Sequence, residues 1–199
     1  MNRSFLLVSC LLLVAFIDNS TAQVRLPQLV RDSMVLQRDT RVRIWGWASA
    51  SAREKVSVQF NNKTYKATTG PDGKWQVYLP PMPAGGPHTM RIKGSNQLEL
   101  KDILIGDVWI CSGQSNMVHQ MILHRELYEQ DIASANNPLI RHFWIPTMTD
   151  LQGPHDDLPT GYWKPATPQD VLQFSAVAYF FAKRSMTGIR FPLALSMPV

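Results

Sequence analysis

Residues 103–111 read ILIGDVWIC, and this nearly uninterrupted apolar run decides the fold. A half-buried strand would alternate apolar and polar side chains, so a continuous run predicts a strand that is buried on both faces of a parallel sheet. Residues 112–117 then read SGQSNM, in which Gly113 permits a sharp turn out of the strand. The sequence therefore predicts a strand, a turn and a helix in direct succession, as in open α/β sheets.

The residues that follow continue the alternation of helices and strands. A helix is expected from about residue 117 to 135, with its apolar side chains roughly on one face: Met121, Leu123, Leu127, Ile132 and Ala135. The next expected elements are a strand at 140–145, a Pro-rich loop at 146–168, a helix at 171–186 and the start of a strand at 191–195. This order predicts a doubly wound α/β domain over residues 102–199.

Residues 23–101 have the texture of an all-β domain. Short runs with the two-residue period of half-buried strands occur at 41–45, 56–60, 75–79 and 90–93. The turn signals are Asn61-Asn62, which predicts a tight hairpin, GPDG at 70–73, and the Pro- and Gly-rich residues 80–87, where no strand pairing is expected to continue. About six short strands at this spacing predict a small β-sandwich.

Residues 1–22 have the features of a signal peptide. Arg3 supplies a positive charge, residues 5–17 are mostly apolar, and small residues permit cleavage after Ala22. The chain is therefore expected to be exported, to the periplasm or medium in a bacterium and to the extracellular space or lysosome in a eukaryote. The alternative is a lipid anchor at Cys10, because the residues before it resemble a lipobox.

Composition and charge exclude several classes of protein. The chain is 45% hydrophobic and 18% charged, which is too apolar for a disordered protein. The net charge is +5, but Lys and Arg are scattered, so no nucleic-acid partner is expected. No apolar run after the signal segment is long enough to span a membrane. Once Cys10 leaves with that segment, Cys111 is the one cysteine, and no internal disulfide is expected.

No metal and no cofactor are expected either. His155 is followed by Asp156 and Asp157, but adjacent residues give poor geometry for chelating an ion. The remaining histidines that could act as a base are expected in the core or on the surface instead: His119, His124 and His142.

The SGQSNM segment is where chemistry is expected. Ser115 lies at a strand-to-helix turn, the edge at which open α/β sheets bind ligands, and its backbone N–H can point at a developing oxyanion. The G-x-S-x-G motif of α/β-hydrolases is not present, because Met117 stands in place of its last glycine. From the residues alone, Ser115 is either a nucleophile or an ordinary helix N-cap.

Residues 106–117, GDVWICSGQSNM, closely resemble the signature of the sialate O-acetylesterases, which belong to the SGNH hydrolases. The resemblance is closest in texture to bacterial members, and it extends over nearly the whole expected mature chain. Further matching segments lie at 32–37, 45–47, 72–75, 80–87, 163–165 and 174–182.

The resemblance implies both a fold and a function. The implied fold is α/β, with a small β-sandwich-like domain at 23–101 that leads into an incomplete flavodoxin-like SGNH hydrolase domain at 102–199. The implied activity is that of a serine carboxylic-ester hydrolase on O-acetylated sialic acid or another acetylated sugar. By the family pattern Ser115 is the nucleophile and an oxyanion donor. Gln114 and Asn116 would bind substrate, and Ser112 is the second candidate for the nucleophile.

Part of the family's machinery is not found in the sequence. A serine needs a base and a group that orients the base, and in SGNH esterases both lie in an Asp-x-x-His segment that this chain lacks. The hydrolase domain is therefore expected to be truncated on its C-terminal side. The alternatives are an inactive fragment or a non-catalytic binding module. A sugar-binding sandwich that uses Trp45, Trp47 and Trp75 is disfavoured, because alternating aromatics in strands are usually core residues.

Overall fold

The computed structural model describes residues 23–51, 53–145, 151, 153–188 and 192–197. The expected signal segment, which includes Cys10, lies outside the described residues. The first strands are β1 (Val35–Gln37), β2 (Val42–Trp47), β3 (Lys55–Phe60), β4 (Lys63–Thr68), β5 (Lys74–Leu79), β6 (Gly85–Lys93) and β7 (Gln97–Ile110). The later elements are α2 (Ser115–Val118), η1 (Met121–His124), α3 (Glu129–Ala133), β8 (Asn137–Trp144), β9 (Tyr162–Ala166), η2 (Val171–Gln173), α4 (Ala176–Ser185) and β10 (Leu193–Met197).

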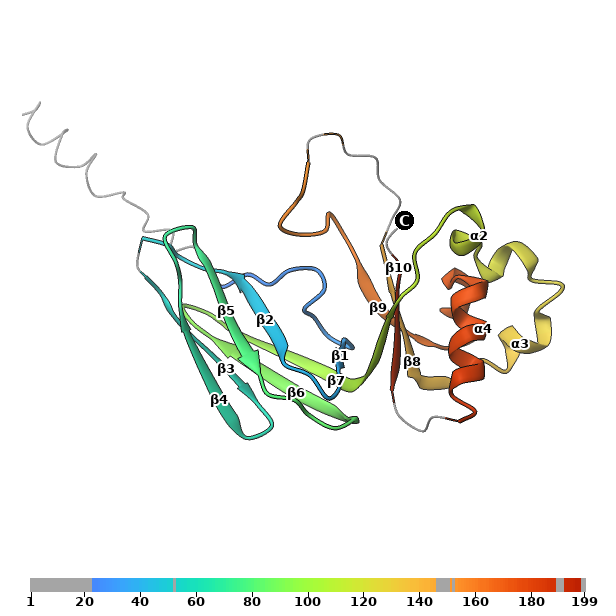
Figure 1. The fold of residues 1–199 in the computed structure, drawn as a ribbon, viewed down its shortest axis with the longest axis horizontal. Coiled ribbons are helices and arrows are strands. Elements are labelled where there is room, and N and C mark those ends of the chain that lie inside the picture. Colours follow the sequence, from blue (N-terminus) through green and yellow to red (C-terminus); the bar gives the residue numbers. More distant parts are fainter. Residues whose placement is uncertain (1–22, 52, 146–150, 152, 189–191, 198–199) are drawn as a thin grey trace, which may run out of the picture.

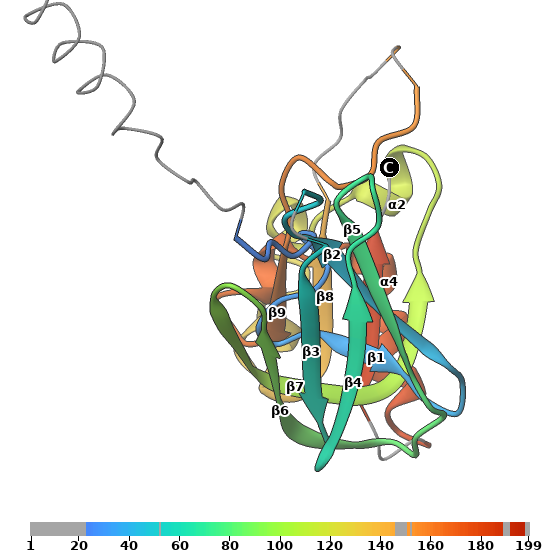
Figure 2. The same ribbon diagram turned by 90° about the vertical axis from the view of Figure 1, so that its left-hand side faces the viewer.

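One large sheet runs through the molecule by way of the long strand β7 (Figure 1). Its order is β4-β3-β6-β7-β10-β8-β9, and β1 also pairs with β7. The first half of β7 pairs with β6 and its end pairs with β10, while β2 and β5 form a separate antiparallel pair beside β3 and β4 (Figure 2). We call β1–β6 with the first half of β7 the β part, and the end of β7 with all later elements the helical part.

Side chains between the β2–β5 pair and the large sheet form the core of the β part. Strand β5 reads KWQVYL, and its Trp75, Val77 and Leu79 are buried whereas the residues between them are exposed. The buried residues of β3 face them from the large sheet and belong to the same hydrophobic core. Because full burial of one such side chain contributes roughly 1.5–3 kcal/mol, the two-residue period of these strands is the main source of their stability.

The hairpin expected at Asn61-Asn62 is confirmed. Both residues have positive φ, 47° and 59°, which asparagine tolerates well, and they join the antiparallel strands β3 and β4. The apolar pattern does not predict β4 itself. Its sequence KTYKAT is polar because β4 is an edge strand, in which Tyr65 and Ala67 are only half-buried.

The Pro-rich segment 80–87 differs from the prediction at its end. Pairing resumes within it, because Gly85 in β6 is already paired with Ile105 in β7. A register shift between Gly85 and His88 accommodates Pro87, which has no N–H to donate to the neighbouring strand. The expectation that no pairing continues through this segment is therefore wrong for its last residues.

The helical part is a sheet with helices on one face. Strand β10 lies in parallel between β7 and β8, and β9 pairs with β8 in antiparallel. Leu193 and Leu195 belong to the core shared with α4, whereas Ala194 points the other way, into the core of the β part. In Figure 1, α2, α3 and α4 all lie on the same side of β8 and β10. The α/β class is thus confirmed, but the doubly wound arrangement is not, because the β part takes the place of helices on the second face of the described sheet.

The helix expected at 117–135 is broken into α2, η1 and α3. The break follows α2, where His119 has a ψ of 107° and leaves the helical conformation. The carbonyl oxygen of His119 then accepts the backbone N–H of Ala176 at 2.8 Å, which ties the broken segment to the start of α4. As a result Leu123 and Leu127 are 62% and 72% exposed and do not form the buried face that the pattern predicts.

Two further differences concern the strands of the helical part. The expected loop at 146–168 contains β9, which tolerates Pro165 because it lies at the edge of the sheet. The strand expected to be buried throughout 103–111 becomes exposed at its end, where Trp109 and Ile110 are 48% and 72% exposed. Among the described strands, β10 alone pairs with these last residues of β7.

His142 on β8 is a buried titratable group. It is 1% exposed, its ring centroid lies 4.5 Å from that of Phe174, and its Nε2 has no hydrogen-bond partner among the described residues. Burial lowers the pKa of His142 to about 4, because the interior disfavours the charged imidazolium. An unfolded histidine takes up its proton near pH 6.5, about the ordinary value. The unfolded chain therefore binds an extra proton between these two values, so stability falls as the pH falls through this window.

We expect His142 to make the free energy of unfolding smaller by roughly 2–3 kcal/mol when the pH is lowered from about 7 to about 4.5. His142→Leu keeps a similar volume without a titratable group and should remove most of this dependence. Urea denaturation of both proteins at the two pH values measures it. His124→Leu, at an exposed position, is the matched control and should keep the wild-type dependence. An unchanged pH dependence in His142→Leu would show that another group carries it.

Candidate active site

Ser115 is the first residue of α2 and follows closely after the end of β7 at Ile110. The N-cap of α2 is Gln114, whose backbone is extended and whose side chain makes no capping hydrogen bond. The backbone N–H of Met117 donates to the carbonyl oxygen of Gln114 at 2.8 Å and closes the first turn. The interpretation of Ser115 as a capping serine is therefore wrong, and its hydroxyl is not used to hold the helix.

Ser115 lines an open pocket of about 860 Å³. The residues around this pocket are Gly113, Gln114, Ser115, Asn116, Val118, His119, Gln120 and Leu123. Three of the residues singled out from the sequence thus meet in one place: Gln114, Ser115 and Asn116 are all exposed and share the pocket. Ser112 is exposed as well but does not line it.

Gly113 allows the turn that presents Ser115. A Cβ atom at this position would lie 3.2 Å from the Cβ of Met117, which is closer than side chains normally pack. Met117 in turn packs against the core of the helical part, and its sulfur lies 3.9 Å from the hydroxyl of Ser175. The glycine therefore lets the turn fold tightly over a residue that anchors α2 to the core.

The wall of the pocket is fixed to the start of α4. Besides the bond between His119 and Ala176, the backbone N–H of Met121 donates to the carbonyl oxygen of Phe174 at 3.0 Å. Gln120 forms an isolated β-bridge with Ser175, the residue whose side chain caps α4. These backbone bonds hold the residues after Ser115 in place although α2 itself is short.

His119 is the one ionisable side chain among the residues that line this pocket. Its ring centroid lies 4.5 Å from that of His124. No carboxylate lines the pocket, so it offers Ser115 an imidazole without an acidic group to orient it. From the sequence, His119 is expected in the core or on the surface, and it is with His155 the first alternative base to test. The available signal was its spacing of four residues from Ser115, which places two side chains on one side of a helix.

Cys111 does not compete with Ser115 as a nucleophile. It is a free cysteine, 9% exposed, and belongs to the core of the helical part. Burial raises the pKa of its thiol, so the reactive thiolate is suppressed at neutral pH.

The carboxylates next to His155 have other partners. Asp156 accepts a hydrogen bond from the ammonium of Lys74 at 2.8 Å, and Asp157 accepts the backbone N–H of Gln28 at 2.9 Å. In the part of the chain that the structure describes, no three His, Cys, Asp or Glu side chains gather closely enough to hold a metal ion. None of the described helices has the length and apolar character needed to cross a membrane.

A carbohydrate acetylesterase from Xanthomonas citri is one of the solved structures that match this chain. Its crystal structure matches 87% of this chain with a TM-score of 0.82 and 36% sequence identity, and the chain covers 40% of that structure. At this similarity the chain shares its fold with the corresponding part of that protein. No protein-family model matches the chain.

Curated proteins of known name also match. The sialate O-acetylesterase of Rattus norvegicus is 27% identical over 187 residues, and that of Homo sapiens is 25% identical over 193 residues. Each match covers 86% of this chain, which spans 34% and 36% of the length of the two relatives. The resemblance inferred from residues 106–117 is therefore confirmed: this chain is similar to the sialate O-acetylesterases over most of its length.

Proposed function

We propose that this chain carries the nucleophile of a carbohydrate esterase, which hydrolyses O-acetyl esters of sialic acids or of other acetylated sugars. The observation that carries the proposal is the position of Ser115, exposed at the first turn of α2 and lining an open pocket. The class of reaction comes from the relatives, which are named sialate O-acetylesterase and carbohydrate acetylesterase. Gln114 and Asn116 support a sugar substrate, because their amides both donate and accept hydrogen bonds.

The proposed reaction passes through an acetyl-enzyme. The Oγ of Ser115 attacks the acetyl carbonyl carbon while a base takes the hydroxyl proton, and the carbonyl oxygen becomes an oxyanion. The backbone N–H of Ser115 lies in the first turn of α2, where no intrahelical acceptor is available, and can donate to that oxyanion. Collapse of the intermediate breaks the ester bond, and the sugar oxygen leaves with the proton from the base. Water then releases acetate from Ser115 by the same steps.

The rate at which this chain can hydrolyse esters depends on the base that takes the proton of Ser115. His119 is the candidate within the pocket, but no carboxylate lines the pocket to orient its imidazole. One donor in an oxyanion hole is worth on the order of 100–1,000-fold in rate, whereas loss of serine activation costs on the order of a millionfold. The second effect is larger, so the 199-residue chain alone is expected to hydrolyse esters near the background rate.

The proposal is tested by acetate release from two proteins. One is the 199-residue chain, and the other is a chimera in which this chain replaces the matching part of the Xanthomonas citri enzyme. We expect the chimera to release acetate and the chain alone to stay near background. O-acetylated sialic acid and acetylated neutral sugars are compared as substrates, because the relatives' names support the ester class more strongly than the sugar.

The control for the chimera is a thermal melt, which shows whether the protein folds cooperatively. A chimera that melts cooperatively but releases no acetate from any of these substrates, beside a parent enzyme that does, would contradict the proposal. It would favour the alternative of a non-catalytic binding module.

A further inference from the structure

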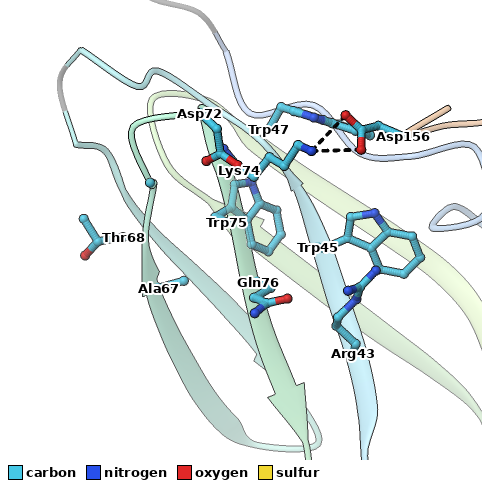
Figure 3. A pocket seen from close by; sticks show the side chains of 11 residues that line it. Arg43, Trp45, Trp47, Ala67, Thr68, Asp72, Lys74, Trp75, Gln76 and Asp156 are labelled. Carbon is cyan, nitrogen blue, oxygen red and sulfur yellow. Dashed lines mark hydrogen bonds and ion pairs between the residues drawn. The ribbon is translucent and has the colours of Figure 1, made fainter. Parts of the chain in front are cut away.

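A second pocket lies in the β part, and the proposed chemistry makes no use of it (Figure 3). Strands β2 and β5, which carry most of its lining, lie away from α2 (Figure 1). The pocket has a volume of about 570 Å³ and lies on the outer face of the β2–β5 pair, between that face, β4 and the loop before β9. Small-molecule sites are typically clefts of roughly 300–1,000 Å³, so one sugar unit or a short part of a glycan would fit.

Two tryptophans form the apolar wall of this pocket. Trp45 and Trp47 alternate with the buried residues Ile44 and Gly46 along β2, so both indoles lie on the outer face and are only half-buried. The expectation that alternating tryptophans are core residues is correct for Trp75, which is 2% exposed, and wrong for Trp47. Trp45 lies between these cases, because it is half-buried and packs against the edge of that core. A strand face that exposes two large indoles side by side has aromatic surface available for a ligand.

Arginines hold the two indoles in place. The guanidinium of Arg43 lies over the ring of Trp45 at 4.7 Å from its centroid, and that of Arg25 lies over Trp47 at 3.8 Å. Such cation–π contacts fix each ring from one side. The aromatic wall is thus ordered before a ligand arrives, which reduces the entropy lost on binding.

Polar groups surround the indoles. Figure 3 shows Arg43 and Gln76 on one side of Trp45 and Trp75, and the ion pair of Lys74 with Asp156 on the other, joined at 2.8 Å. These side chains supply both hydrogen-bond donors and acceptors, as the hydroxyls of a sugar require.

The charges around the pocket favour a neutral ligand. Its two cationic residues, Arg43 and Lys74, are balanced by two carboxylates, Asp72 and Asp156, so no net positive charge is available for an anionic sugar.

We propose that this pocket is a binding site for a neutral glycan, in which the apolar face of a pyranose stacks on Trp45 and its hydroxyls bond to Asp72, Gln76 and Asp156. The site does not depend on Ser115, since it needs no acetyl group and no catalysis. It would hold the carbohydrate chain on which an esterase of this kind acts.

The test measures binding without catalysis. The 199-residue chain is titrated with unacetylated tetrasaccharides of xylose, glucose, mannose and galactose, with tryptophan fluorescence and calorimetry as readouts. We expect at least one of them to bind. Trp45→Ala should weaken that binding about tenfold or more, as removal of a central aromatic contact usually does. Trp45→Phe should restore part of it and guards against a folding defect.

Tyr78→Ala is the matched control. Tyr78 is exposed on the face of β5 that also carries Lys74 and Gln76, but it does not line the pocket. Its replacement should therefore leave the affinity for the tetrasaccharide unchanged. The proposal is overturned if none of the four tetrasaccharides binds at about 10 mM, which is weaker than almost any specific site. It is also overturned if Trp45→Ala binds as well as the wild type, or if free sialic acid binds more tightly than the neutral glycans.

Discussion

Replacing Ser115 by alanine should abolish acetate release by the chimera, with a loss in kcat on the order of a millionfold, as when the nucleophile of a serine hydrolase is removed. The physical reason is that no other group in the pocket can take its place. Cys111 is buried with a raised pKa, and Ser112 does not line the pocket. Ser112→Ala is the matched control, because it removes a hydroxyl three residues away in the same exposed turn. It should keep most of the activity, since Ser112 does not line the pocket.

The same substitution in the 199-residue chain separates two accounts of the base. If the chain alone releases acetate at enzyme-like rates and loses this with Ser115→Ala, a described residue must act as the base. His119→Ala should then remove the activity, whereas His124→Ala, one ring further from the pocket, should not. That outcome would contradict our expectation that His119, with no carboxylate in the pocket to orient it, is not an effective base.

Replacing Asp102 by asparagine should destabilise the fold by about 2–3 kcal/mol. The guanidinium of Arg141 is 4% exposed and donates to the two carboxylate oxygens of Asp102 at 2.7 and 3.0 Å. Removing one partner of a buried ion pair commonly costs about 3–5 kcal/mol, because it leaves the other charge buried. We expect less here, since 46% of the Asp102 side chain is exposed and water can reach it. Asparagine is chosen because Asp102 has a φ of 57°, which asparagine tolerates.

Urea denaturation measures this effect. The double variant Asp102→Asn/Arg141→Met should be more stable than the sum of the two single changes predicts, because it leaves no buried charge. Glu99→Gln is the control, because it breaks the solvent-exposed pair with Arg91 and should change stability much less. If Asp102→Asn and Glu99→Gln have equal effects, the buried pair does not stabilise the contact between the two parts of the molecule.

Asp102 also links stability to pH. The hydrogen bond from Arg141 is the main reason why the pKa of its carboxyl lies below the usual value. The stabilisation by this pair is therefore fully present above the ordinary pKa of aspartate and is lost as the pH falls through the lowered pKa. This window lies below that of His142, so the two effects can be separated by titration.

The strands of the β part are predictable from the sequence where one face is buried. The alternation in KWQVYL of β5 follows directly from its position over a core, and Asn61-Asn62 specifies its own turn. Strand β4 is not predictable in this way, because an edge strand with few buried side chains has no apolar period. The same holds for β9, where Pro165 argues against a strand unless its position at the edge is known.

The broken helix shows a different limit. The apolar residues Leu123 and Leu127 have helical spacing, yet both are exposed, because backbone bonds to the start of α4 fix the chain in another path. Such bonds join segments that are far apart in the sequence, and a periodic pattern cannot reveal them. The packing of the β part on one face of the β8–β10 sheet also joins segments that are far apart in the sequence, so it could not be predicted from a periodic pattern either.

The candidate site is predictable only in part. Ser115 and its neighbours could be singled out because strand, turn and nucleophile lie in one short segment. The presence of His119 in the same pocket depends on where α2 stops, which no local pattern specifies. To predict the tryptophan pocket, one must know which face of β2 points outward. The sequence does not show this, because both faces of the strand carry large side chains.

Covalent labelling of the chimera can identify its nucleophile, which we propose to be Ser115. The chimera is treated with a fluorophosphonate probe, digested, and mapped by mass spectrometry. We expect a single phosphonate adduct on the peptide that contains Ser115, and we expect it to be lost when acetylated substrate is present in excess. An adduct on Ser112 or on a serine outside this turn, in a chimera that releases acetate, would contradict this proposal.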